Sequence, residues 1–232
     1  MNDDIERAKN RGHDLLAAAD ADLEAGRITE AAWYARIDAV ITPAYLAAEN
    51  PRAQSGHSGD EARWHHARGL LVDLLSGDGT FFDVGCANGY LMESLTRWAR
   101  DERGFALEAH GLDIAPSLAT LARRRLPDLA SRIHVGNALT WSPPRRYEHV
   151  RTGLEYVPRR RRRDLLRHLL DDLVAPGGRL IVGVYNEERD DLLRGPSLEA
   201  RVASWGFPIG GRGEHPHRDA RLRYRAFWIG KT

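Results

Sequence analysis

Apolar residues recur at helical spacing in the first 50 residues of the chain. Leu16, Ala19 and Leu23, for example, fall on one face of a helix. The spacing predicts two helices, over about residues 4–24 and 28–48. The break between them coincides with a glycine, which is a poor residue for a helix interior.

A loop and a third helix are expected next. Pro43 is expected to bend or interrupt the second helix, because proline lacks the backbone N–H that a helix interior uses. Residues 50–60 have the composition of a loop, and a helix is predicted over about 61–75. We therefore expect an N-terminal helical extension, residues 1–60, followed by the main domain, residues 61–232.

From Thr80 onward, short apolar runs alternate with helical segments. This alternation is typical of a doubly wound α/β domain, a parallel sheet with helices on both faces. The expected strands cover 80–84, 107–113, 132–136, 147–152, 178–185 and 221–229, and the expected helices 89–100, 116–126, 159–173 and 197–205.

Composition narrows the possible functions. The 34 basic and 33 acidic residues leave a net charge of +1, which gives no support to a dedicated nucleic-acid binder. The charged N-terminus does not resemble a signal peptide, and no apolar run has the length of a membrane span, so we expect a cytoplasmic protein without a membrane partner. Cys86 is the only cysteine, which excludes an intrachain disulfide and a cysteine-based zinc site.

The segment 81–91 carries the clearest chemical signal. An apolar strand ends at Asp83 and enters a turn with Gly85 and Gly89, where the backbone can approach a ligand closely. The spacing differs from the dinucleotide fingerprint, because Ala87 stands where that pattern needs glycine. A tight strand-to-helix turn without a ligand is the alternative.

A second acidic strand end follows at Asp113. A carboxylate there can accept hydrogen bonds from both hydroxyls of a ribose. Alternatively, Asp113 caps the next helix. Taken together, the glycine turn and Asp113 indicate a nucleoside-bearing ligand without a pyrophosphate.

These motifs resemble those of the class I S-adenosylmethionine-dependent methyltransferases, and the resemblance covers about residues 60–230. It implies a Rossmann-like, mostly parallel seven-stranded sheet with an antiparallel last strand, and S-adenosylmethionine as the cofactor. The cofactor-binding residues that it implies are Asp83, Gly85, Cys86, Ala87, Gly89, Asp113, Ile114, Asn137, Ala138 and Leu139.

The chain departs from the family pattern at three places. Ala87 replaces a common glycine, which matters if the position needs a positive φ. Asn137 replaces the usual aspartate, so its amide oxygen can accept a hydrogen bond only without charge assistance. Arg151 and Thr152 stand where many members carry an aspartate, which leaves the role of that acid unfilled.

On the acceptor side, the resemblance points to Glu155, Tyr156, Tyr185, Asn186 and the 50–66 segment with His57. Glu155 is a general base, a ligand for a cationic acceptor or a solvated carboxylate. Tyr156 is a wall of the acceptor pocket or a group that orients the nucleophile. His57 is a second candidate base or a surface histidine.

Two further features have simpler explanations. The run from Arg159 to Arg163 could meet phosphates, but adjacent helical residues spread around the circumference, so a solvated face is favoured. His65 and His66 should diverge on a helix, and His215 and His217 lack nearby carboxylates, so we expect no metal site.

The sequence therefore predicts an enzyme that transfers a methyl group to an oxygen or nitrogen of a small-molecule acceptor, without a nucleic-acid partner. Residues 1–60 would cap the acceptor pocket or form a homodimer contact. One alternative is a nucleic-acid methyltransferase, although Ser142-Pro143-Pro144-Arg145 lacks the motif that holds a flipped base. The other is a regulator that binds S-adenosylmethionine without chemistry.

Overall fold

The computed structural model describes residues 2–184, 197–217 and 223–231, with the side chains of the first helix described from Asp14 onward. Tyr185 and Asn186, expected on the acceptor side, lie outside the described residues. In the part of the chain that is described, no helix is long and apolar enough to cross a membrane.

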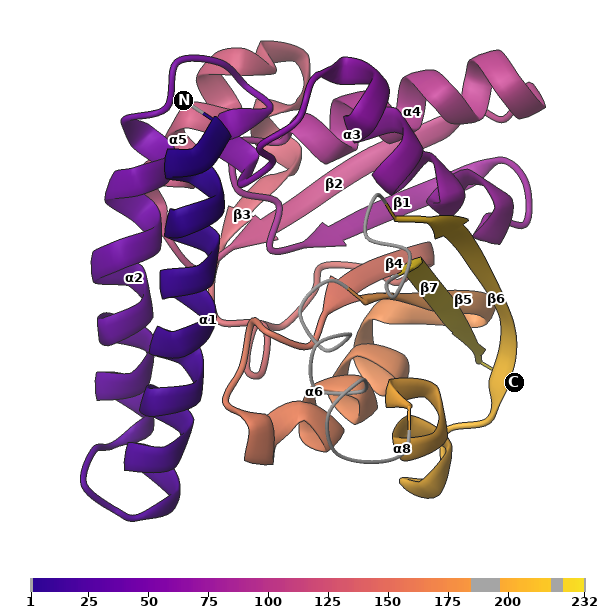
Figure 1. Cartoon of the computed structure of the whole chain (residues 1–232). Helices are drawn as coiled ribbons and strands as arrows, with labels where there is room; N and C mark the ends of the chain where they lie inside the picture. Colours follow the sequence, from indigo (N-terminus) through magenta and orange to yellow (C-terminus); the bar gives the residue numbers. More distant parts are fainter. Residues whose placement is uncertain (1, 185–196, 218–222, 232) are drawn as a thin grey trace.

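A seven-stranded sheet forms the centre of the molecule, with the order β3-β2-β1-β4-β5-β7-β6 (Figure 1). The first five strands run parallel, and β7 is antiparallel to both of its neighbours. The predicted fold class is thereby confirmed. The strand bounds are β1 Gly79–Val84, β2 Leu107–Asp113, β3 Ile133–Val135, β4 Tyr147–Gly153, β5 Val174–Val184, β6 Ile209–Pro216 and β7 Arg223–Gly230.

Helices cover both faces of the sheet because alternate strand residues bury apolar side chains on opposite faces. Phe81 and Ile181 pack in one core with residues of α4 and α5. Phe82 and Leu180 pack in the other core with residues of α6 and α8. The first face carries α3 Glu61–Arg68, the 3-10 segment η2 Gly69–Leu74, α4 Tyr90–Arg103 and α5 Pro116–Arg125; the second carries η4 Arg159–Arg161, α6 Arg162–His168, the π-helical turn η5 Leu169–Leu173 and α8 Leu198–Ser204.

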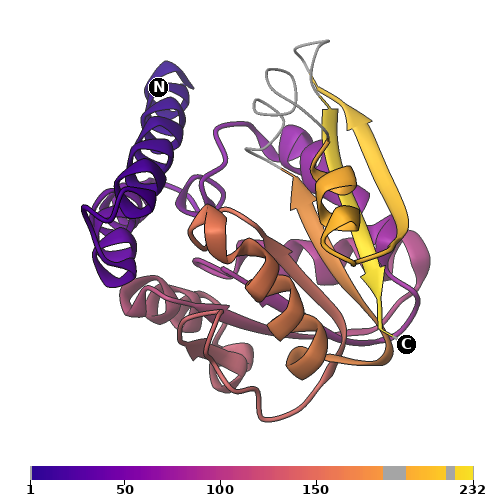
Figure 2. The same ribbon diagram turned by 90° about the horizontal axis from the view of Figure 1, so that it is seen from below.

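The N-terminal extension is a hairpin of α1 Asn2–Glu24 and α2 Glu30–Leu46. Figures 1 and 2 show the two helices side by side, next to the sheet and outside its covering layers. Trp33 packs with Ala19 and Leu23 in a small core of the hairpin. Its indole N–H donates to Asp20 Oδ1 at 3.0 Å, so a buried polar contact also joins the two helices.

The structure differs from the expected elements at three places. Helix α2 is not interrupted at Pro43 and runs on to Leu46, although the proline has no N–H to donate to the Ala39 carbonyl. The third helix changes to a 3-10 helix at Gly69. The strand β6 was not expected from its glycines, charges and Pro216, residue types that are tolerated at a sheet edge.

Candidate functional site

The strand order reverses between β1 and β4, and the loop after β1 lies at this switch point. Gly85 has φ +75° and Gly89 φ +77°, and a Cβ at Gly85 would lie 2.6 Å from the Tyr156 ring. Ala87 has φ +47°, the only positive φ of a non-glycine residue in the described ranges. That conformation costs an alanine roughly 1–2 kcal/mol. The position therefore does need a positive φ, although it carries a side chain.

Asp113 joins this loop to the end of β2. Its Oδ2 accepts from the Ala87 N–H at 2.7 Å and its Oδ1 from the Ala115 N–H at 2.9 Å. The side chain is only 7% exposed, and burial raises its pKa to about 6 in spite of the two backbone hydrogen bonds. Each oxygen keeps a lone pair, so the carboxylate can fix the loop and accept further hydrogen bonds.

Asp83 and Arg151 form a buried ion pair beneath the glycine loop. They are register partners in β1 and β4, with Arg151 Nη1 at 3.0 Å from Asp83 Oδ1. The same Nη1 donates to the Tyr156 hydroxyl at 2.9 Å. Asp83 Oδ2 is buried and has no hydrogen-bond partner among the described residues, so one oxygen is left for a ligand.

Arg151 belongs to the candidate site, and sequence reasoning missed its place there. Its only signal was a basic residue near the end of an apolar strand, at a position where the family often has an acid. Arg68, at the end of α3, adds a second positive charge, which also lowers the pKa of Asp83 against the larger effect of burial. We call Asp83, Gly85, Ala87, Asp113 and Arg151 the switch-point site.

The other residues predicted to bind the cofactor differ in the exposure of their side chains. Ile114 is 44% exposed, which is unusual for a large apolar residue beside a carboxylate. Asn137 Oδ1 accepts from the Leu139 N–H at 2.9 Å, and Leu139 and Ala138 pack against the core. The Cys86 side chain is buried toward Gly111, and its backbone N–H donates to the Leu112 carbonyl at 3.0 Å, so Cys86 supports the loop from inside.

The candidate catalytic residues do not share one environment. Glu155 and Tyr156 follow β4 directly, and the Glu155 carboxylate folds back against Gly153. His57 is only 4% exposed and packs edge-on against Trp64, with the ring centroids 5.2 Å apart. The view of His57 as a surface residue is therefore wrong, while its catalytic role stays a prediction.

The arginine run is a solvated face only in part, because three of its five side chains are exposed and the others contact the rest of the protein. Arg160 Nη2 and Arg161 Nη1 each lie 3.0 Å from the Glu30 carboxylate of α2. Arg162 is buried and donates to the Leu154 carbonyl at 3.1 Å. The run starts as a 3-10 turn and meets the hairpin, so it attaches the N-terminal extension to the segment after β4.

The histidines diverge, as expected. His65 Nε2 lies 2.7 Å from Glu102 Oε1, whereas His66 Nε2 lies 2.8 Å from the Pro216 carbonyl oxygen. Among the described residues, no group of three or more histidine, cysteine or acidic side chains is arranged to hold a metal ion.

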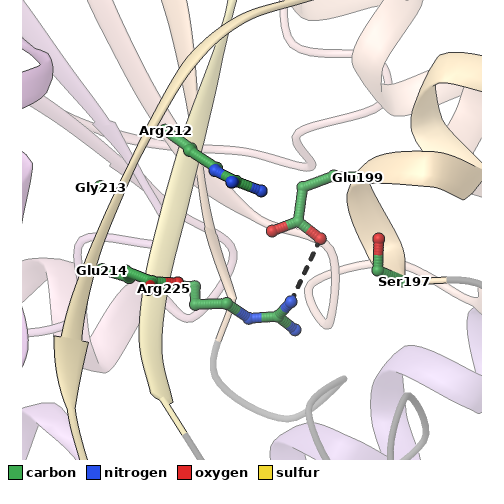
Figure 3. A pocket seen from close by; sticks show the side chains of 6 residues that line it. All are labelled: Ser197, Glu199, Arg212, Gly213, Glu214 and Arg225. Carbon is green, nitrogen blue, oxygen red and sulfur yellow. Dashed lines mark hydrogen bonds and ion pairs between the residues drawn. The ribbon is translucent and has the colours of Figure 1, made fainter.

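A pocket of about 150 Å³ lies between α8 and the β6–β7 pair, away from β1 (Figure 3). Glu199 points between Arg212 and Arg225 and lies 3.3 Å from Arg225 Nη1. The lining of the pocket contains two acidic side chains, Glu199 and Glu214, and two basic ones, Arg212 and Arg225. The contact between Glu199 and Arg225 joins α8 to β7, and the pocket is separate from the switch-point site.

The same fold occurs in solved methyltransferase structures. N-methyltransferase NodS from Bradyrhizobium japonicum WM9, in complex with S-adenosylhomocysteine, is 17% identical, with a TM-score of 0.61 over 82% of this chain and 96% of that chain. Burkholderia thailandensis 1,6-didemethyltoxoflavin-N1-methyltransferase, with its acceptor and S-adenosylhomocysteine bound, is 16% identical, with a TM-score of 0.60 over 88% and 91%. Magnesium protoporphyrin IX methyltransferase from Synechocystis PCC 6803, with S-adenosylmethionine bound, is 17% identical, with a TM-score of 0.53 over 82% and 89%.

No protein-family model matches the sequence, and neither does any curated protein. At these identities the structural similarity shows a shared fold, and the function has to be argued from the site.

Proposed function

We propose that this protein is an enzyme that transfers a methyl group from S-adenosylmethionine to an oxygen or nitrogen of a small-molecule acceptor. The observation that carries the proposal is the switch-point site: a glycine loop, the Asp113 carboxylate and a buried, unpaired oxygen of Asp83 meet at adjacent strand ends. This is the place where open α/β sheets bind ligands.

The residues present fit the parts of this cofactor. The unpaired Asp83 Oδ2 can accept from the ammonium of the methionine part, and Asp113 can accept from the ribose hydroxyls. The exposed side chain of Ile114 offers an apolar contact to the adenine ring. Asn137 can accept from the adenine amino group with the remaining lone pair of its amide oxygen.

S-adenosylmethionine, when bound, supplies an activated methyl group on a positively charged sulfur. The protein's task is then to hold the nucleophile in line and to take up its proton where needed. We propose Glu155 as the first candidate for the base that removes the proton of the nucleophile, because Glu155 follows the end of β4. His57 is the second candidate. Tyr156 is held by Arg151 and orients the acceptor or walls its site.

Several observations support a small acceptor. The near-zero net charge argues against nucleic acid, and two similar structures carry the names of small-molecule acceptors. The contacts of Glu30 with the arginine run favour the extension as a cap over the homodimer alternative. We propose a cytoplasmic location, as the sequence predicts.

Thermal unfolding with added ligands tests this function. At about 100 times its dissociation constant, S-adenosylhomocysteine should add about 2.7 kcal/mol of stability, which raises Tm by about 5–10 °C. NAD serves as the control and should leave Tm unchanged. A shift with NAD and none with S-adenosylhomocysteine would overturn the assignment. Transfer of a radiolabelled methyl group to a panel of metabolites then separates an enzyme from a binding protein.

A further inference from the structure

One face of α2 meets the switch-point site. Tyr34, Asp38 and Tyr45 are spaced by four and seven residues, which places them on one side of a helix. Burial raises the pKa of Tyr34, and Asn137 is close enough to its hydroxyl to oppose that shift. The charge of Asp38 contributes to the raised pKa of Asp113. The extension therefore approaches the residues assigned to the cofactor.

Tyr45 makes the closest approach of this helix. It packs against a small apolar cluster formed by Ala87 of the glycine loop, the α5 N-cap Ala115 and Leu118 of α5. On the other side, the Cα of Gly56 lies so close to the Tyr45 hydroxyl that a Cβ could not fit. Gly56 also has φ +79°, so both conformation and space favour glycine there. Tyr45 thus lies between Gly56, in the segment that follows α2, and the glycine loop after β1.

The hydroxyl of Tyr45 is close enough to two carboxylates with different assigned roles for their charges to act on it. Burial raises its pKa to about 12, and the negative charges of Glu155 and Asp113 add to the shift. Asp113 is assigned to the ribose, and Glu155 to the acceptor side. Tyr45 packs against the cluster that contains Ala87 and Ala115, whose N–H groups donate to Asp113, so the ring lies beside the carboxylate assigned to the ribose.

Two side chains of the glycine loop contact the N-terminal extension and the loop that follows its helices. Asn88 is fully buried, and its Nδ2 donates to the Pro51 carbonyl at 2.7 Å and to Gln54 Oε1 at 3.4 Å. Ala87 supplies its methyl group to the cluster with Tyr45. Glycine would adopt φ +47° at position 87 without strain but would lack that contact.

We propose that Tyr45 is a cofactor-binding residue supplied by the N-terminal extension, and that Ala87 and Asn88 couple closure of the extension to occupancy of the glycine loop. The proposal rests on the proposed function and adds to it a residue outside the family motifs. It means that release of the cofactor requires the Tyr45 ring to leave Ala87. The dissociation rate, more than the association rate, should then depend on Tyr45.

Dissociation of S-adenosylhomocysteine, measured by surface plasmon resonance on the full chain, tests this role without a known acceptor. Tyr45→Ala should accelerate release by about tenfold or more, because it removes the whole ring contact. Tyr45→Phe keeps the ring and isolates the hydroxyl. Leu46→Ala is the matched control, since the neighbouring side chain is 41% exposed and should leave release unchanged. Release by Tyr45→Ala within twofold of wild type would overturn the proposal.

Ala87→Gly provides a second variant that separates binding from folding. It should leave Tm unchanged or raise it, because the left-handed strain disappears, while release accelerates about three- to tenfold. A purely structural contact would change both in the same direction. Hydrogen exchange should also show that the ligand protects α2 in wild type and less in Tyr45→Ala. If wild type fails to bind S-adenosylhomocysteine, the proposed function itself fails; if it binds and Ala87→Gly releases at the wild-type rate, only the coupling is refuted.

Discussion

Protonation of Asp113 should control cofactor affinity near neutral pH. Its pKa is raised from an ordinary value of 3.8 to about 6, first by burial and further by the charges of Asp83 and Asp38. In the proposed function the ionised carboxylate accepts from ribose hydroxyls on both oxygens, whereas the protonated form has a smaller capacity to accept. Affinity should therefore be constant above about pH 7 and fall as the pH drops through 6.

The magnitude follows from the size of the shift. At one pH unit below its pKa, only about a tenth of the Asp113 carboxyls are ionised, so affinity at pH 5 should be about tenfold lower. The same shift affects folding with the opposite sign. Because the folded state keeps the proton between pH 3.8 and 6, stability of the free protein should decline as pH rises through this window, by about 3 kcal/mol.

Titration calorimetry with S-adenosylhomocysteine between pH 5 and 8 measures the effect. Asp113→Asn is the informative variant, because it keeps one acceptor oxygen but sets an amide NH₂ against the N–H of Ala87 or Ala115. Its affinity at pH 7.5 should be about 10- to 150-fold lower and independent of pH. Asp113→Ala would also leave both backbone donors unpaired and is expected to weaken folding. A wild-type affinity that is flat from pH 5 to 8 would refute this role.

Two other predictions concern the acceptor side and the buried ion pair. Glu155→Gln should lower turnover by about 10²–10⁴ at unchanged cofactor affinity if Glu155 takes up the proton, and Tyr156→Phe should lower it only if the hydroxyl orients the nucleophile; wild-type turnover in both would remove them from the chemistry. Arg151→Met should destabilise the protein by about 3–5 kcal/mol in urea unfolding, because it leaves the Asp83 carboxylate buried without its partner. Arg151→Lys keeps the charge, and an equal loss in both variants would show that guanidinium geometry, and not charge, is what Asp83 requires.

The order of strands and helices could be predicted because each element carries its own hydrophobic period. The sequence alone also predicted that the glycine turn after Asp83 and the carboxylate of Asp113 lie close together. Asp83 and Asp113 end successive strands, and parallel neighbours bring their carboxyl ends to one edge of the sheet. The β6 strand could not be found in this way, since its glycines and charges have no apolar period.

Contacts between distant segments were decided by the tertiary structure alone. Arg151 pairs with Asp83 because the β1–β4 register sets them side by side, 68 residues apart. Nothing in the local sequence near Tyr45 indicates that it reaches Ala87, since that contact depends on how the hairpin lies against the sheet. A residue's neighbours in its own segment determine its secondary structure, whereas the partner of a buried charge or ring is fixed only when separate elements pack. The sequence thus determined the elements and the glycine loop after β1, and packing decided which side chains surround that loop.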